Sequence, residues 1–60
     1  MTTARAGWQL VGYRGGPREG DIAWTFFNRG ADMDNMDSHK GRYRYSHRYD
    51  SIMYYRYVGP

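Results

Sequence analysis

The chain has 60 residues, a formal net charge of +3 and no cysteine. A chain of this length forms one small domain at most (1–60), and it buries only about 60% of its unfolded surface, so its stability is marginal. The absence of cysteine excludes disulfides and thiolate metal sites, and no stretch approaches the roughly 20 apolar residues of a membrane span.

The first seven residues contain one basic residue and no apolar run, which is not the pattern of a signal peptide. We therefore expect a flexible N-terminus over 1–6 and a cytoplasmic protein that meets no membrane. The two tryptophans, seven tyrosines and two phenylalanines favour a folded core, because disordered segments are poor in aromatic residues.

Two strands are predicted in the first half of the chain. Residues 8–13 are rich in β-forming side chains, and 22–28 resume the pattern with Ile22, Trp24 and Phe26 on one face. The second segment is apolar on both faces, which is typical of a central strand, and one of these faces is expected to close an interface.

Two polar segments are predicted to be loops. The glycine-rich segment 14–21 lacks the Gly-Lys-Ser/Thr ending of a phosphate-binding loop and is interpreted as a connection. Segment 29–41 contains three aspartates and is interpreted as a mobile acidic loop, in which a short helical turn over 32–39 stays open. It does not fit a calcium loop, because Asp37 stands where glycine is required and Tyr43 where glutamate is required.

The clearest pattern in the chain is an alternation over 42–49, where tyrosine or histidine alternates with arginine or serine. Only an extended strand separates these two sets onto opposite faces. Turn residues around Asp50 and Ser51 lead to a second strand over 52–58. The chain is therefore predicted to end in a Tyr/Arg-rich hairpin with tyrosine on one face and arginine on the other.

The length of the turn decides the register of this hairpin. A three-residue turn gives four cross-strand pairs: Tyr43–Tyr57, Tyr45–Tyr55, His47–Met53 and Arg44–Arg56. A two-residue turn would instead bring Arg56 onto the tyrosine face. We favour the first register because cross-strand aromatic pairs stabilise a hairpin by up to ~1 kcal/mol each, although it sets two arginines opposite one another unless an anion lies there.

The hairpin is the main candidate for a binding surface. We expect partner contacts from four arginines and two tyrosines: Arg42, Arg44, Arg48, Arg56, Tyr45 and Tyr54. Arginine and tyrosine are enriched at protein-binding hot spots, and they also hold single-stranded nucleic acids. A second interpretation is about as well supported as a binding surface: the tyrosines form the core of the sheet, and the arginines form its solvated face.

No catalytic constellation, metal site or cofactor is predicted. His47, Asp50 and Ser51 supply the residue types of a catalytic triad, but neighbouring positions on one hairpin do not set up base, orienter and nucleophile. His39 and His47 have no cysteine partners and are interpreted as surface or packing residues. A sheet of this size also has little room for a pocket that excludes water, so we expect no enzyme.

Several short motifs occur in an order that resembles small accessory proteins of tailed bacteriophages. They are Gly12-Tyr13-Arg14, Gly20-Asp21, Trp24, a loop that ends at Gly41, and Tyr55-Arg56-Tyr57. Those proteins usually carry a second arginine where Tyr57 stands. The group has no uniform activity, so the resemblance implies a context only: small phage proteins often bind and redirect host machinery.

The predicted fold is mostly β, a small antiparallel sheet of three to four strands in meander order with little helix. With little helix to pack on it, the second face of the sheet would be exposed to solvent, so we expect self-association or a partner to bury it. The predicted function is that of a small, phage-encoded interaction protein that binds and inhibits or redirects a host protein. The alternative is a nucleic-acid or nucleotide-binding protein. A protein partner is favoured, because nucleic-acid binding requires tyrosine and arginine on one surface.

Overall fold

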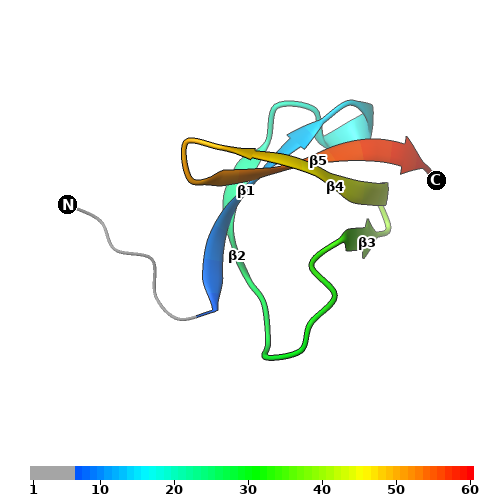
Figure 1. The fold of residues 1–60 in the computed structure, drawn as a ribbon. Coiled ribbons are helices and arrows are strands. Elements are labelled where there is room, and N and C mark those ends of the chain that lie inside the picture. The colour runs from blue at the N-terminus through cyan, green and yellow to red at the C-terminus, as the bar shows by residue number, and fades with distance from the viewer. Residues whose placement is uncertain (1–6) are drawn as a thin grey trace.

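The computed structural model describes residues 7–60, and the fold is mostly β, as predicted. One sheet contains five strands: β1 (Trp8–Arg14), β2 (Ile22–Phe26), β3 (Asn35–Ser38), β4 (Gly41–Tyr49) and β5 (Ile52–Gly59) (Figure 1). Within these residues a single 3-10 turn, η1 (Gly16–Arg18), is the one helical element, and no helix is long and apolar enough to cross a membrane. The segment 1–6, which we expect to be flexible, lies outside the described residues.

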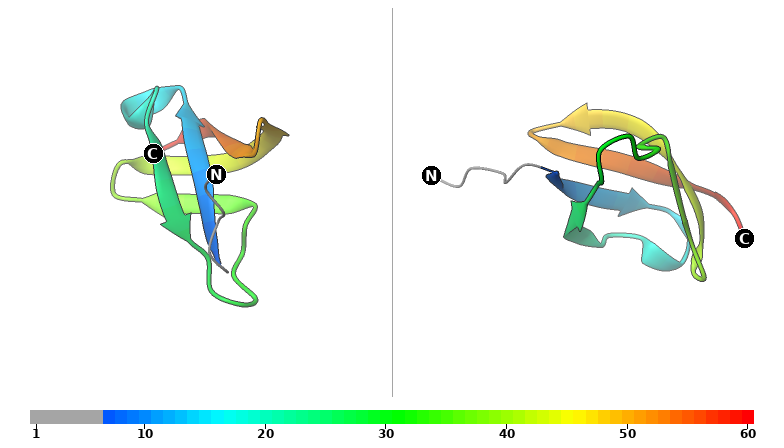
Figure 2. Two further views of the ribbon diagram at one scale, coloured as in Figure 1. Left: turned by 90° about the vertical axis from the view of Figure 1, so that its left-hand side faces the viewer. Right: turned by 90° about the horizontal axis from the view of Figure 1, so that it is seen from below.

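The order of the strands differs from the predicted meander. Neighbouring strands follow the order β2-β1-β5-β4-β3, with β1 and β5 parallel and the other pairs antiparallel. The prediction of a purely antiparallel sheet of three to four strands is therefore wrong, because alternation along a strand reports its buried face and not its neighbour. The predicted central strand, β2, lies at an edge. The sheet curls into a half-barrel (Figure 2).

The additional strand, β3, lies within segment 29–41, which the sequence predicts to be a loop. It pairs with the start of β4 in an antiparallel ladder. Two hydrogen bonds to the Asp32 carboxylate precede it, from the backbone N–H of Asp34 (2.9 Å) and the side-chain amide of Asn35 (2.8 Å). Because Asp and Asn are poor strand formers, this strand depends on its pairing with β4 and not on its composition.

The terminal hairpin turns over two residues instead of the expected three. Tyr49 pairs with Ile52, which leaves Asp50 and Ser51 as the turn. Both have positive φ angles, 52° and 66°, which suit the tight turns that match the twist of two strands. Taken alone, such a turn would bring Arg56 onto the tyrosine face.

A bulge at Ser46 restores the predicted register. Tyr45 pairs with Tyr55, whereas His47 pairs with Tyr54, so Ser46 has no residue opposite it. Beyond the bulge three predicted pairs are confirmed: Tyr43–Tyr57, Arg44–Arg56 and Tyr45–Tyr55. The predicted pairing of His47 with Met53 is wrong, because the bulge moves His47 to the opposite face.

The core lies on one face of the sheet, which we call the inner face. Its buried side chains are Val11, Tyr13, Tyr43, Met53 and Tyr55. The rings of Tyr13 and Tyr43 meet edge to face with their centroids 5.1 Å apart. Aromatic rings thus supply most of the buried apolar area in a chain with few aliphatic residues.

Two loops cover the inner face, and a tyrosine hydroxyl holds each of them. The Tyr43 hydroxyl donates to the carbonyl oxygen of Gly15 (2.7 Å) and accepts from the backbone N–H of Arg18 (2.8 Å), which fixes the η1 loop. The Tyr55 hydroxyl donates to the carbonyl oxygen of Met33, between β2 and β3. Among residues 7–60, no tyrosine hydroxyl holds a loop over the opposite face of the sheet.

Candidate functional site: the outer face of the sheet

The outer face, which points away from the core, carries large apolar side chains in contact with solvent. Register and alternation assign it seven residues of β1, β2 and β5: Trp8, Leu10, Ile22, Trp24, Phe26, Ile52 and Tyr54. Four of them, Trp8, Ile22, Trp24 and Phe26, are 42%, 55%, 45% and 49% exposed, and we call the three aromatic residues of this set the aromatic end. Its Trp8 and Phe26 rings touch across the strands, with centroids 5.3 Å apart.

Three arginines form a line across the opposite end of the outer face, and we call them the arginine row. Arg14 of β1 pairs in register with Arg56 of β5, and Arg56 pairs with Arg44 of β4. Neighbouring strands lie about 4.8 Å apart, so the three side chains start from adjacent points on the sheet. Like charges directly opposite one another destabilise a sheet, and a bound anion would relieve this repulsion.

No acidic residue belongs to the four longer strands. Together β1, β2, β4 and β5 contain five arginines and neither aspartate nor glutamate. The one ion pair found among residues 7–60 joins Arg18 to Asp21 (3.6 Å), beside the η1 turn. The charge of the arginine row therefore has no acidic neighbour on the strands that carry it.

A stacked pair of rings lies between the aromatic end and the arginine row. The rings of Tyr54 and His47 have centroids 5.1 Å apart and planes 16° apart. Gly12 leaves room for this pair, because a Cβ atom there would lie 2.7 Å from Cε1 of Tyr54. Tyr54 precedes Arg56 by two residues, so these side chains project from one face of β5 and their Cα atoms are about 7 Å apart along the strand.

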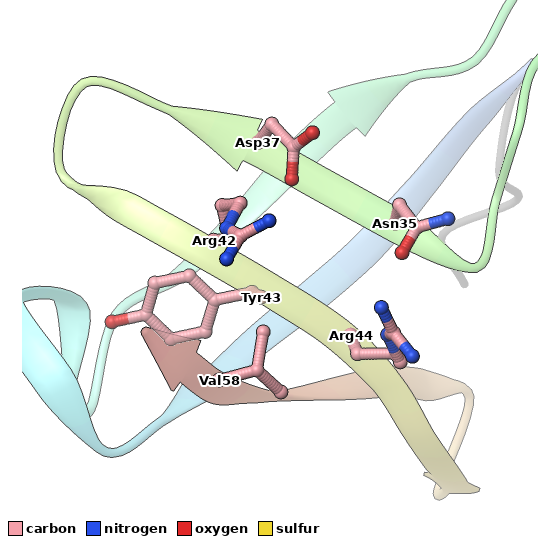
Figure 3. Close-up of a pocket in the computed structure, with 6 residues that line it drawn as sticks. All are labelled: Asn35, Asp37, Arg42, Tyr43, Arg44 and Val58. Atoms are coloured by element: carbon pink, nitrogen blue, oxygen red, sulfur yellow. The ribbon is translucent and has the colours of Figure 1, made fainter. Parts of the chain in front are cut away.

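A polar pocket of about 240 Å³ opens beside the arginine row, between β3 and β4 (Figure 3). In the ladder that lines it, Asp37 faces Arg42 and the neutral Asn35 faces Arg44. The Nε group of Arg42 also donates to the backbone oxygen of Pro60 (3.1 Å). Arg42 therefore has a carboxylate across the ladder, whereas Arg44 has a neutral amide there and the Asp32 carboxylate in the preceding loop as its acidic neighbour.

The structure brings together four of the six side chains predicted to contact a partner: Arg42, Arg44, Arg56 and Tyr54, all on the outer face. Arg48 lies on the inner side, where its guanidinium donates to Oε1 of Gln9 (2.8 Å). Tyr45 also belongs to the inner face, with its ring 5.7 Å from that of Tyr55. The bulge at Ser46 explains why Arg48 lies on the inner side, because it inverts the faces on which the following residues project.

Other outer-face residues were not predicted to contact a partner: Arg14, His47, Trp8 and Trp24. The alternation of Ile22, Trp24 and Phe26 already indicates an apolar face that a partner could cover. Arg14 gives no such signal, because its alignment with Arg56 arises from a parallel pairing between strands distant in sequence.

Among residues 7–60 two titratable groups have perturbed pKa values, Tyr55 in the core and Asp32 in the loop before β3. Burial raises the pKa of Tyr55 to about 12. Hydrogen bonds from the Asn35 amide and the Asp34 backbone lower the pKa of the Asp32 carboxyl, and Arg44 of the arginine row makes a smaller contribution. Over residues 7–60, no three His, Asp or Glu side chains gather closely enough to hold a metal ion.

Comparisons with known proteins give no match to this chain. Neither a scan against models of protein families nor searches of curated proteins and solved structures finds a similar protein. The resemblance to small accessory proteins of tailed phages stays a prediction. The outer face is therefore interpreted from its own chemistry.

Proposed function

We propose that this chain is a small non-enzymatic binding protein whose partner covers the outer face of the sheet. The observation that carries this proposal is the presence of the exposed aromatic end and the arginine row on one face. Large exposed apolar patches on small proteins mark interaction sites. Tryptophan, tyrosine and arginine contribute most of the contact energy where proteins bind one another.

The size of the surface supports a partner that also contacts the arginines. An aromatic side chain buries about 150–250 Å² when fully covered, so the half-exposed Trp8, Trp24 and Phe26 together offer about 300 Å². A standard interface uses about 800 Å² on each partner. A partner of ordinary affinity would therefore extend from the aromatic end across Tyr54 to the arginine row.

Two classes of partner suit this surface. The sequence favours a protein because it assigns tyrosine and arginine to opposite faces of the hairpin. On the outer face, however, Tyr54 lies beside the arginine row, and Trp8 and Trp24 lie farther along the same face. That reason for preferring a protein is lost, so a host protein in a phage-infected cell and a nucleic acid are both retained as partners to be tested.

The experiment compares two variants that each lose one exposed apolar side chain, one on the outer face and one elsewhere. Trp24→Thr removes a half-exposed ring from the aromatic end, and Met33→Thr removes a similarly exposed side chain from the loop before β3. Immobilised wild type and both variants are exposed to a cell extract, and the recovered partner is then titrated to saturation by calorimetry.

We expect saturable binding by wild type and by Met33→Thr, and loss of binding by Trp24→Thr. Equal affinities for all three would move the binding surface away from the outer face. Light scattering on the free proteins tests self-association: a dimeric wild type with a monomeric Trp24→Thr would identify a second copy of the chain as the partner.

A further inference from the structure

We infer that the outer face binds a single-stranded nucleic acid, with phosphate groups on the arginine row and a base against the stacked Tyr54 and His47 rings. The inference rests on the proposed function and adds the chemical class of the partner.

The distribution of charge on the outer face favours a polyanion. The arginine row sets Arg14, Arg56 and Arg44 side by side on three adjacent strands, and the four longer strands carry no acidic residue. The planar guanidinium fork matches the oxygen atoms of a phosphate group. Successive phosphates along a strand would relieve the repulsion between all three arginines, whereas one carboxylate would relieve only a single pair.

The spacing between ring and guanidinium suits a nucleotide. Tyr54 and Arg56 project from the same face of β5 with their Cα atoms about 7 Å apart, so the ring and the guanidinium can contact the base and the phosphate of one nucleotide. His47 extends the ring surface onto β4, beside Arg44. A base stacked on this pair would therefore leave its phosphate within reach of the arginine row.

The aromatic end provides surfaces for further bases. The Trp8, Trp24 and Phe26 rings are each about half exposed and lie on the same face as Tyr54. Every base has a flat face that can stack on such rings, so this kind of binding tolerates many sequences. A duplex is disfavoured, because its bases are already stacked on one another and are not free to contact side chains.

The test uses fluorescence anisotropy with a labelled single strand of thymidines, about 12 nucleotides long. A duplex of the same length and polyglutamate, a polyanion without bases, serve as comparison ligands. We expect the single strand to bind more tightly than either at about 50 mM salt, and its affinity to fall steeply towards about 200 mM.

Two matched pairs of variants locate the site. Arg56→Gln, in the arginine row, is paired with Arg48→Gln, which removes the same charge from the inner side of the same hairpin. We expect Arg56→Gln to weaken binding about tenfold at low salt and to reduce the salt slope by about one, with Arg48→Gln within about twofold of wild type.

The second pair tests the rings. Tyr54→Leu removes a ring from the outer face, and Tyr45→Leu removes one from the inner face. We expect Tyr54→Leu to weaken binding about fivefold or more with an unchanged salt slope, and Tyr45→Leu to have little effect. Thermal unfolding followed by circular dichroism confirms that each variant is folded at the assay temperature.

The outcomes separate this inference from the proposed function. Equal losses in both members of a pair, or polyglutamate binding as tight as that of the oligonucleotide, would overturn the inference. If no oligonucleotide binds while Trp24→Thr still abolishes association with a protein, the inference fails and the proposed function stands. If no oligonucleotide binds and Trp24→Thr changes neither self-association nor binding to any protein, the inference and the proposed function both fail.

Discussion

The buried tyrosines Tyr43 and Tyr55 perform two tasks at once in this small core. Tyr43 is 1% exposed and Tyr55 is 0% exposed, and each hydroxyl makes a hydrogen bond to the backbone of a loop over the inner face. The ring supplies apolar area, and the hydroxyl pairs with backbone groups of the loop that would otherwise have no hydrogen-bond partner. A chain with few aliphatic residues can thus anchor its loops and fill its core with the same side chains.

Tyr43→Phe tests the contribution of one hydroxyl. The substitution leaves the Gly15 carbonyl and the Arg18 N–H without this partner, so the free energy of unfolding should fall by about 1–3 kcal/mol, measured by denaturant titration. The control is Tyr45→Phe, which removes the hydroxyl of a 36% exposed tyrosine on the same face and should change stability by less than about 0.5 kcal/mol. Similar losses in both variants would contradict the anchoring role.

Because of Tyr55, the free energy of unfolding should vary with pH in the alkaline range. The pKa of its hydroxyl is raised from 10.0 to about 12. The largest cause is burial, and smaller contributions come from the nearby Tyr13 and Asp34. The folded state thus holds this proton more tightly than the unfolded state, so the stabilisation is complete below pH 10 and is lost as the pH rises towards about 12. The shift corresponds to about 3 kcal/mol.

The measurement is the free energy of unfolding from about pH 8 to about pH 12 in wild type and in Tyr55→Phe. Stability should decline more steeply above pH 10 in wild type than in the variant. An unchanged decline would assign the alkaline transition to other groups.

At the scale of elements, the terminal hairpin combines a tight turn with a compensating bulge. The turn of Asp50 and Ser51 would set the tyrosines of β4 out of phase with those of β5, and the extra residue at Ser46 corrects the phase. The same bulge sends His47 to the outer face and Arg48 to the inner side. One irregular position therefore determines both the packing of the core and the composition of the candidate site.

Ser51→Gly should stabilise this hairpin. Ser51 has a φ of 66°, a conformation that costs an L-residue about 1 kcal/mol and costs glycine little. The hydrogen bond from the Gln9 amide to the Ser51 carbonyl (2.7 Å) involves only the backbone at this position and persists. We expect a gain of about 0.5–1 kcal/mol in chemical denaturation. Ser46→Gly, where φ is not positive, should instead lower stability.

Elements with a strong alternating pattern could be predicted from the sequence, and those set by pairing could not. The segments of β1, β2 and β5 are recognisable from their β-forming side chains, and that of β4 from its strict alternation. No such signal marks β3, whose Asn35 and Asp37 are typical of loops. For the site, Arg44, Arg56 and Tyr54 could be assigned from the hairpin alone, whereas Arg14 required the parallel pairing of β1 with β5.

At the scale of the whole molecule, acidic and basic residues occupy different elements. All six acidic residues lie in loops, in the hairpin turn or on β3, while five arginines lie on β1, β4 and β5. The net charge of +3 therefore understates how positive the outer face is. Separation of this kind directs an anionic partner to one side of a small protein.

The stability of the molecule should depend more on the side chains of the inner face than on those of the outer face. Met53→Ala removes a buried side chain and should cost about 2–4 kcal/mol of unfolding free energy. Trp24→Thr removes a larger but half-exposed ring from an edge strand and should cost less than about 1 kcal/mol. Urea titration of both variants provides the comparison, and an equal loss would mean that the outer face is part of the core.

The two edges of the sheet are protected unequally. β3 is short and carries Asp37, a charge that discourages another chain from adding to that edge. β2 has no charged residue, and its unpaired backbone lies beside the exposed Trp24 and Phe26 rings. Copies whose outer face is uncovered would therefore aggregate through β2. If the proposed partner exists, it would also act as a chaperone for this chain, and the ratio in which the two are synthesised would set how much soluble protein the cell retains.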